Sequence, residues 1–240
     1  SGTYEGQIRG GSTNFVLGSL STGTLKLTNN SNAYQGTTTV NAGTLIVGDG
    51  ATGMLAGPGT VTVNAGTLGG ALASGNNFAG AVVIGNNTGT GDAVFTGATI
   101  GTAGRIASAG AVTFNSDGKF VFDLVSTAGD VTCDLLVVAN GAGVTNINNG
   151  ALFDFTFTGD SGAVTLGQTF TAIDGGSFAG NAGVFSNLAE GGLVTSNGVT
   201  LQASYSGGDL VFTVVPEPAS IAFVAGGIGM LLMLRRRQRA

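Results

Sequence analysis

The hexapeptide VNAGTL occupies residues 40–45 and recurs at residues 63–68, with a looser copy, TGTLKL, at residues 22–27. The Gly-Thr-Leu steps of the three copies begin at Gly23, Gly43 and Gly66. Each full copy places a short alternation of Thr and Val before a turn and a second short strand after it. Alternation predicts a half-buried strand, and Asn and Gly adopt the left-handed conformations that sharp corners need. A period of about 20 residues with short strands therefore predicts one coil of a β-solenoid.

Residues 101–214 have longer predicted strands and more phenylalanine than the repeats. Phe153, Phe155 and Phe157 alternate with other residues, as in a strand that turns one face to the core. Longer strands with a bulky core would cover the open end of a solenoid, which otherwise offers unpaired backbone. The predicted strands span residues 119–125, 134–139, 151–159, 168–174, 199–205 and 209–215.

We therefore expect an all-β fold whose body is a right-handed parallel β-helix, or β-solenoid. Three parts follow one another along the chain. Solenoid repeats cover residues 1–100, a longer-stranded C-terminal β-helix or cap region covers residues 101–214, and a tail covers residues 215–240. The boundary near residue 100 is a change in strand length and not a linker.

The composition excludes several kinds of protein and of site. Glycine supplies 45 of the 240 residues, but without the strict triplet period of collagen. A hydrophobic content of 42% with 9% charged residues argues against disorder. Histidine is absent, which excludes a Ser-His-Asp triad and a His-ligated metal. Cys133 has no partner for a disulfide, and its apolar surroundings predict a small buried residue and not a nucleophile.

The body of the chain is acidic. Residues 1–214 hold four basic residues against twelve acidic ones, and the other arginines stand at the C-terminus. Such a body has no electrostatic footprint for nucleic acid, so we expect no nucleic-acid partner. The chain begins at Ser1 without a visible leader, and we therefore expect it to be a fragment or a processed product.

The C-terminal stretch VVPEPASIAFVAGGIGMLLMLRRRQRA (residues 214–240) combines a proline motif, an uncharged span and an arginine cluster. The prolines end the last strand, because proline lacks an N–H and restricts the residue before it. Residues 219–234 carry no charge; as a helix they would reach roughly 24 Å, slightly short of the roughly 30 Å hydrocarbon core. We expect one transmembrane helix here, with the arginines snorkelling and remaining cytoplasmic. The predicted sorting motif is Val215, Pro216, Glu217 and Pro218, and the predicted cytoplasmic basic cluster is Arg235, Arg236, Arg237 and Arg239.

This tail closely resembles the PEP-CTERM sorting domain of Gram-negative bacteria. The resemblance implies recognition by an exosortase, a membrane-embedded cysteine protease that cuts near the Pro-Glu-Pro motif and passes the body to the outer surface. It also implies that Glu217 and its flanking prolines are recognised by the protease and do no chemistry themselves. The apolar tail would then be a removable anchor. The alternative is a buried helix of a soluble domain, but the predicted helix has no polar face to present to water.

Residues 18–48 resemble the autotransporter-associated β-strand repeat, with a mild departure at Ala33, where Thr is usual. The region after residue 100 resembles the closing portion that follows such repeats in large exported passenger proteins, in the stretches DLLVVANGAGV, GQTFTAIDGG, GVFSNLAEGG and YSGGDLVFTVV. The repeat positions that match are Gly23, Thr24, Leu25, Asn32, Tyr34, Gly36, Thr38, Val40, Gly43, Thr44 and Leu45.

Three acidic residues of the second half are candidates for catalysis. Asp123, Asp134 and Asp154 each lie in or beside a predicted strand. Stacked on one face, they would form a carboxylate pair or triad, as in glycoside hydrolases. The simpler interpretation places them on the solvent face or at strand starts. The apolar neighbours of Asp123 and Asp154 point to the opposite side of their strands, as for a surface residue. We favour this interpretation and predict no catalytic residue.

Other polar groups are interpreted as turns and strand residues. Asp49, Asp92 and Asp209 follow glycine, but not in the regular array that calcium-binding β-rolls require, so turn chemistry explains them. Threonines at residues 37–39, 60 and 62 would form a flat face of the ice-binding kind only if more coils carried them. The Asn pairs at residues 29–30, 76–77, 86–87 and 148–149 are expected at corners.

These features favour an exported, non-catalytic, adhesin-like protein of the cell surface or the extracellular matrix, in a biofilm or exopolysaccharide setting. It would be anchored in the inner membrane during sorting and would then reach the outer surface or the medium. The expected partners are the exosortase-type protease, the membrane and exopolysaccharide, and no cofactor or metal is expected. The alternative is a β-helix that binds or degrades polysaccharide. An enzyme would bring two or three carboxylates together in a shared cleft.

Overall fold

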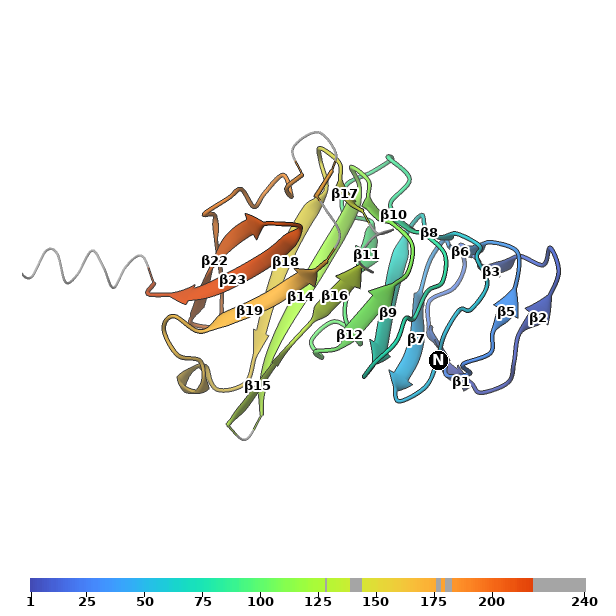
Figure 1. The fold of residues 1–240 in the computed structure, drawn as a ribbon, viewed down its shortest axis with the longest axis horizontal. Coiled ribbons are helices and arrows are strands. Elements are labelled where there is room, and N and C mark those ends of the chain that lie inside the picture. Colours follow the sequence, from blue (N-terminus) through green and yellow to red (C-terminus); the bar gives the residue numbers. More distant parts are fainter. Residues whose placement is uncertain (128, 139–143, 176–177, 180–182, 218–240) are drawn as a thin grey trace, which may run out of the picture.

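The fold is built almost entirely from β-strands that stack in parallel (Figure 1). The computed structural model describes residues 1–127, 129–138, 144–175, 178–179 and 183–217. Successive coils of the chain lie side by side along the long axis, from the N-terminal coils to the strands before the tail. Each coil contributes to three faces, and the strands of each face pair with the equivalent strands of the neighbouring coils.

The first face is a long sheet of seven strands, each of which pairs in parallel with the next. It begins with the N-terminal strand and ends near the C-terminal sheet. Its strands are β1 (Gly2–Tyr4), β4 (Thr24–Leu27), β7 (Thr44–Gly50), β9 (Gly66–Leu72), β11 (Ala93–Phe95), β14 (Gly118–Thr127) and β18 (Leu152–Thr158).

The other two faces follow the same order along the axis. The second face holds β2 (Arg9–Gly10), β5 (Ala33–Tyr34), β12 (Arg105–Ser108), β16 (Leu135–Val138) and β19 (Thr169–Asp174), and single parallel bridges at Leu55 and Phe78 connect its two halves. The third face holds β3 (Phe15–Leu17), β6 (Thr38–Val40), β8 (Val61–Val63), β10 (Val82–Ile84), β13 (Val112–Phe114), β17 (Thr145–Ile147) and β20 (Phe178–Ala179).

The sequence repeats stack in register. On the first face Thr24 lies opposite Thr44, and Thr44 lies opposite Thr67. The Leu residue that follows each Thr is in register too, and its side chain in β7 and in β9 is fully buried. The Gly-Thr-Leu steps therefore occupy one position of successive coils, which confirms the predicted coil period.

The corner between β6 and β7 shows why the repeat contains Asn-Ala-Gly. The side chain of Asn64 donates to that of Asn41 in the coil before it, at 2.8 Å. Gly43 has φ 73° and Gly66 has φ 87°, a left-handed conformation that favours glycine. A Cβ on Gly66 would also lie 2.5 Å from the carbonyl oxygen of Gly43. Glycine at this corner allows the backbones of neighbouring coils to approach closely.

The core changes along the axis. The N-terminal coils are filled by Val, Leu and Ile, whereas the later coils are filled by phenylalanine. Phe95 and Phe114 lie 5.9 Å apart in an edge-to-face contact, and Phe120 meets Phe153 in the same way at 5.9 Å. Aromatic pairs of this geometry add to the stability gained by burial.

Antiparallel strands cover the C-terminal end of the parallel stack. The strands β21 (Leu193–Ser196), β22 (Val199–Ser206) and β23 (Asp209–Val215) form a meander, and β23 pairs with β19. Phe212 from β23 stacks on Phe122 at 5.3 Å, so this meander closes the phenylalanine core. The long hairpin partner of β14 is β15 (Asp130–Cys133), and a single 3-10 turn, η1, covers Ser161–Ala163.

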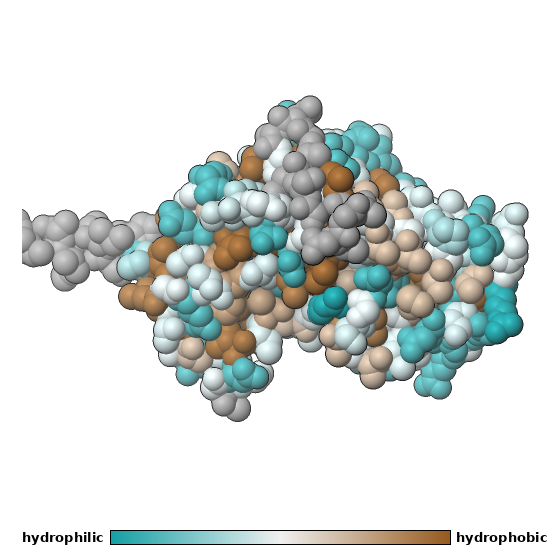
Figure 2. Space-filling model, in the orientation of Figure 1, coloured by the Kyte–Doolittle hydropathy of each residue, from teal (hydrophilic) through white to brown (hydrophobic). Residues whose placement is uncertain are grey.

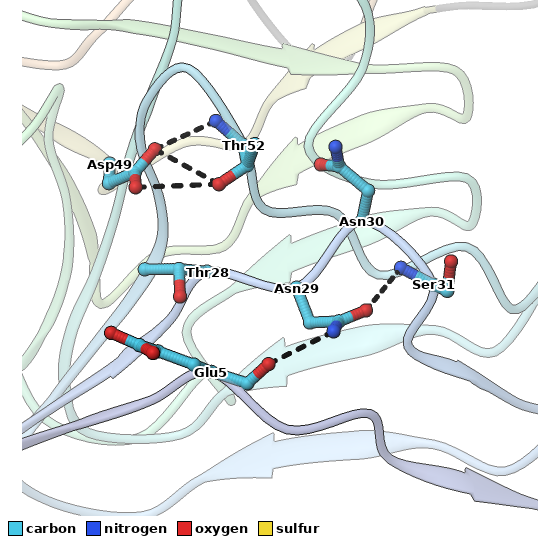
Figure 3. Close-up of a pocket in the computed structure, with 7 residues that line it drawn as sticks. All are labelled: Glu5, Thr28, Asn29, Asn30, Ser31, Asp49 and Thr52. Atoms are coloured by element: carbon cyan, nitrogen blue, oxygen red, sulfur yellow. Dashed lines mark hydrogen bonds between the residues drawn. The ribbon is translucent and has the colours of Figure 1, made fainter.

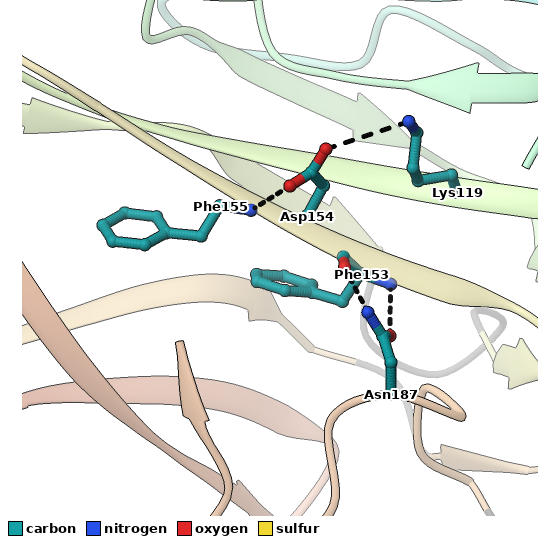
Figure 4. Close-up of polar contacts among 5 residues, drawn as sticks. All are labelled: Lys119, Phe153, Asp154, Phe155 and Asn187. Carbon is teal, nitrogen blue, oxygen red and sulfur yellow. Dashed lines mark hydrogen bonds and ion pairs between the residues drawn. The ribbon is translucent and has the colours of Figure 1, made fainter. Parts of the chain in front are cut away.

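Side chains form hydrogen bonds with backbone groups along the free edge of strand β18. The amide of Asn187 donates to the Phe153 carbonyl at 2.7 Å and accepts from the Phe153 N–H at 2.8 Å (Figure 4). Further along, the Asn197 amide donates to the Phe157 carbonyl at 2.6 Å. These amides replace the backbone of a missing strand, so the free edge of β18 has fewer unpaired groups.

The predicted all-β parallel fold is confirmed, and each strand predicted after residue 100 has its counterpart in the structure. The handedness of the solenoid and the division into three regions stay predictions. Within the described residues there is no helix that is long and apolar enough to span a membrane. The predicted transmembrane helix, residues 219–234, lies outside the described residues.

Candidate functional site

Two of the three candidate carboxylates meet inside the protein. Asp123 on β14 and Asp134, in the step between β15 and β16, are both fully buried, with 0% exposure. The hydroxyl oxygen of Thr96 lies 3.4 Å from Asp123 Oδ2 and 3.3 Å from Asp134 Oδ2. The expectation that Asp123 faces solvent is therefore wrong. Strand alternation does place it opposite the core, but residues 96–104 fold back over that outer side.

Within this covering segment, residues 97–104 form a loop, which we call the 97–104 loop. The Asp134 side chain forms hydrogen bonds with the backbone at both ends of this loop. Its Oδ2 accepts from the backbone N–H of Gly97 at 3.0 Å and from that of Asp123 at 3.2 Å. Its Oδ1 accepts from the backbone N–H of Gly104 at 2.8 Å. The Asp134 carboxyl therefore joins the loop to the β14–β15 hairpin.

Asp123 holds the tip of the same loop. Its Oδ2 accepts from the backbone N–H of Gly101 at 2.8 Å. Its Oδ1 is buried and makes no hydrogen bond of ordinary geometry with a described residue, although the Thr156 hydroxyl and the Thr102 N–H lie near enough to the carboxyl to oppose the effect of burial on its pKa. An unpaired oxygen on a buried carboxylate is costly, and less so when the group is neutral.

Burial dominates the electrostatics of the pair. It raises the pKa of Asp134 to about 7; the Gly97 N–H opposes this shift, and the neighbouring charge of Asp123 adds to it. Burial also raises the pKa of Asp123, against the hydrogen bonds from Gly101 and Thr96. Two like charges without a buried cation disfavour full ionisation.

Asp154 lies apart from this pair. It projects from the outer side of β18, with its side chain 58% exposed, and its Oδ2 lies 3.8 Å from Lys119 Nζ (Figure 4). The predicted surface position of Asp154 is confirmed. The three acidic residues thus make a buried pair and one surface ion pair, and no triad.

A polar hollow lies where three successive coils turn from the first face to the second. Asp49 Oδ1 accepts from the backbone N–H of Thr52 at 2.7 Å (Figure 3). It also accepts from the backbone N–H of Ala51 at 2.9 Å, so the predicted turn role of Asp49 is confirmed. The Asn29 amide donates to the Glu5 carbonyl in the coil before it, at 3.0 Å. The hollow is lined by Glu5, Thr28, Asn29, Asn30, Ser31, Asp49 and Thr52.

The remaining Gly-Asp candidates serve local contacts or stay exposed. Asp209 Oδ1 accepts from the backbone N–H of Gly175 at 2.9 Å, and Asp92 is exposed. Across the part of the chain that the structure describes, no three His, Cys, Asp or Glu side chains come together as a metal site would require.

Asp117, which is not among the candidates predicted from the sequence, is fully buried at a corner. Its carboxylate accepts from the backbone N–H of Asn86 at 2.9 Å and from that of Asn87 at 2.7 Å, in the coil before it. Asn87 has φ 65°, so the corner that Asp117 fastens is a left-handed one. The signal was available: an Asp-Gly step at one corner follows an Asn pair at the corner of the preceding coil.

The threonines do not form a continuous flat face. Thr38 points into the core with 2% exposure and its hydroxyl bonds to that of Tyr34. Thr39 and Thr62 lie opposite each other on the outer side, and Val16 and Val83 flank them in the same row. The array is therefore two threonines wide.

Cys133 is half-buried, whereas the sequence predicts a buried residue. Its thiol lies 3.9 Å from the Thr171 carbonyl oxygen. Burial, with a smaller effect of the Asp134 charge, raises the pKa of the thiol to about 11. A nucleophilic cysteine needs the opposite shift, because the thiolate is the reactive form.

The predicted sorting motif begins where the last strand ends. Val215 is the final residue of β23, and Pro216 and Glu217 are exposed. Pro218 and the basic cluster of Arg235, Arg236, Arg237 and Arg239 lie outside the described residues. The exposed start of the motif leaves the folded body at the end that the antiparallel meander covers (Figure 1).

Comparison with known proteins identifies one part of the chain. The passenger-associated-transport-repeat family matches residues 20–47. These residues form β4, β5, β6 and the start of β7, a full coil and its corner. No curated protein and no solved structure matches the chain. The match supports the predicted autotransporter-associated repeat, and together with the parallel solenoid it indicates a secreted or surface-exposed, adhesin-like protein.

Proposed function

We propose that this chain is a non-catalytic structural protein of the cell surface or the extracellular matrix, exported and then sorted through its C-terminal tail. The observation that carries the proposal is the passenger-associated repeat at residues 20–47, which stacks in register within a continuous parallel solenoid. Such a body gives length and a regular surface, because each coil contacts only its neighbours. On the face seen in Figure 2, apolar residues lie in small groups between polar ones.

The absence of catalysis is part of the proposal. The carboxylate pair of Asp123 and Asp134 has 0% exposure, so a polysaccharide chain has no access to it. Asp154 is accessible but is paired with Lys119. Hydrolysis needs an acid and a base on either side of a bound sugar, and these carboxylates do not provide that arrangement.

The sorting part of the proposal rests on the tail sequence. Pro216 and Glu217 are exposed just beyond β23, where a protease could reach them without unfolding the body. An exosortase-type membrane protease would recognise the motif from Val215 to Pro218 while residues 219–234 span the inner membrane. The body would then be released to the outer surface or the medium.

The sorting proposal is tested by replacing the four C-terminal arginines with Ser in the full chain and fractionating the cells. We expect the variant to remain unprocessed and to appear in a different cell fraction from the unchanged chain, because the positive charges hold the end of the tail in the cytoplasm. A matched control replaces Arg9, Lys26, Arg105 and Lys119 with Ser, which changes the charge equally in the body. Normal processing of the tail variant would contradict the proposal.

A second candidate function is polysaccharide binding, and the polar hollow favours it. Its hydroxyl, amide and carboxylate groups come from three coils, so the hollow crosses the coils along the axis (Figure 3). Sugar hydroxyls pair with side chains of this kind. Affinity electrophoresis in gels of the host's exopolysaccharide would test it, with Thr28→Val and Glu5→Gln against Asp154→Asn as control. Equal retardation of all variants would argue against binding in the hollow.

A further inference from the structure

The Thr96 hydroxyl faces two carboxylates but has a single hydrogen. It lies 3.4 Å from Asp123 Oδ2 and 3.3 Å from Asp134 Oδ2, both longer than an ordinary hydroxyl–carboxylate bond. A hydroxyl donates once and accepts twice. Two ordinary two-centre bonds therefore require that one of the carboxyls is protonated and donates to Thr96, which gives a chain from carboxyl to hydroxyl to carboxylate; with both groups ionised, Thr96 would have to share its single hydrogen between them.

The unpaired oxygen of Asp123 agrees with a bound proton. Its Oδ1 is buried and makes no hydrogen bond of ordinary geometry, although the Thr156 hydroxyl on β18 is near enough to influence the carboxyl's pKa. A doubly ionised pair would leave that oxygen charged, unpaired and beside a second negative charge. One proton shared by the pair removes this cost.

Among the residues that the structure describes, the surrounding elements offer no cation to replace the proton. The charged group nearest in sequence to the 97–104 loop is Arg105 on β12, whose guanidinium donates to the Gly75 carbonyl at 2.8 Å. On β14 and β18, Lys119 and Asp154 pair with each other. The neighbouring titratable groups Cys133 and Asp130 on β15 and Asp174 on β19 add no positive charge.

We propose that Thr96, Asp123 and Asp134 form a proton-binding site that holds the 97–104 loop on the β14–β15 hairpin. The loop lies where the short-stranded coils give way to the phenylalanine-filled coils, so the site fastens this junction. With the proton bound, all three glycine N–H contacts and the Thr96 chain are satisfied. Without it, repulsion between the carboxylates acts directly on the tip of the loop at Gly101. The proton belongs to the pair and not to either residue.

The test follows aspartate carboxyl carbons by NMR in the full chain labelled with carbon-13 aspartate. We expect one carboxyl transition with a midpoint near 7, against 3.8 for an ordinary aspartate. It should be lost in Asp134→Asn. In Asp123→Asn it should move downward, because burial still raises the pKa of Asp134 while the neighbouring charge is removed. In Thr96→Val it should move upward, because the ionised form loses a donor. Asp154→Asn should leave it unchanged. If every aspartate titrates below about 5, both carboxyls ionise in the ordinary range and the proposal is wrong.

A second readout separates proton binding from a merely structural role. Amide hydrogen exchange at Gly101 and Gly104 should accelerate above pH 7 by more than that of amides in β22 and β23. In Asp134→Asn this extra acceleration should be lost even if the variant is less stable. If amide exchange at Gly101 changes with pH in the same way as exchange in β22 and β23, the proposed loosening of the loop is wrong.

Discussion

Gly43 and Gly66 occupy the same corner of neighbouring coils, and both have a left-handed φ. Replacing Gly66 with Ala should lower the free energy of unfolding by at least about 1 kcal/mol, from strain at φ 87° and from contact with the Gly43 carbonyl. Urea denaturation would measure it. Gly18→Ala is the matched control, since a Cβ there meets nothing within 4 Å and the φ is ordinary. An equal loss in both variants would contradict this account of the corner.

The buried carboxylates predict an unusual dependence of stability on pH. A carboxyl whose pKa is raised in the folded state contributes most below its unfolded value, near 3.8, and that contribution is lost as the pH rises through about 7. Ordinary carboxyls have finished titrating by about pH 5. The free energy of unfolding should therefore fall by up to a few kcal/mol between pH 5 and pH 8. Urea midpoints across this range would show it, and Asp134→Asn should flatten the curve. A rise over the same range would contradict the prediction.

At this scale the sequence predicts local contacts better than distant ones. The turn at Asp49 and the exposure of Asp154 follow from nearby residues. The burial of Asp123 does not follow from nearby residues. Its outer side is covered by residues 96–104, which come before β12 and β14 in the chain. A strand pattern gives the side to which a residue points, but not whether another segment covers that side.

The edge of β18 depends on Asn187, whose amide pairs with both backbone groups of Phe153. Asn187→Ala should leave these groups without a partner and cost roughly 1–3 kcal/mol. Asn187→Asp should also destabilise, because a carboxylate cannot donate to the Phe153 carbonyl. Asn76→Ala is the control, because the half-buried Asn76 side chain makes no hydrogen bond with the described residues. Thermal unfolding of the four proteins would compare them, and unchanged stability in Asn187→Ala would refute the role of this amide.

Strands were predictable because alternation and repetition both mark them. The predicted strand at residues 209–215 coincides with β23, and that at residues 119–125 lies within β14. The β14–β15 hairpin was missed, since the polar start of β15 lacks a clear alternation. The second face is also hard to predict from the sequence. At Leu55 and Phe78 it consists of single bridges, which are too short to produce an alternating pattern of polar and apolar residues.

For the whole molecule, the antiparallel meander is expected to decide solubility. A chain that ends at residue 192 would lose β21 to β23, leaving the edge of β19 that faces β23 unpaired and removing Phe212 from the stack with Phe122. We expect it to aggregate or to bind a hydrophobic dye. A chain that ends at Val215 keeps the meander and lacks the tail, and it is the matched control. Equal solubility of the two chains would show that the meander is dispensable.

The stacked plan of the molecule could be predicted from the coil period, whereas its surface chemistry could not. Identical Gly-Thr-Leu steps fix the register, and the register fixes which residues enter the core. The polar hollow instead depends on Glu5, Asn29 and Asp49, which three different coils bring together. Their proximity follows from stacking, and nothing in their spacing alone marks a site.

The parallel ladders also have a mechanical consequence. Because the strands of each face lie across the long axis, the hydrogen bonds between coils run along it (Figure 1). A pulling force on the two ends would therefore load the coils in series, and the weakest junction would yield first. On the second face the ladder between β2 and β5 pairs two residues of each strand, and only single bridges connect the coils that follow it. Under tension this molecule should lengthen by peeling from its N-terminal coils, while its phenylalanine-filled end stays folded.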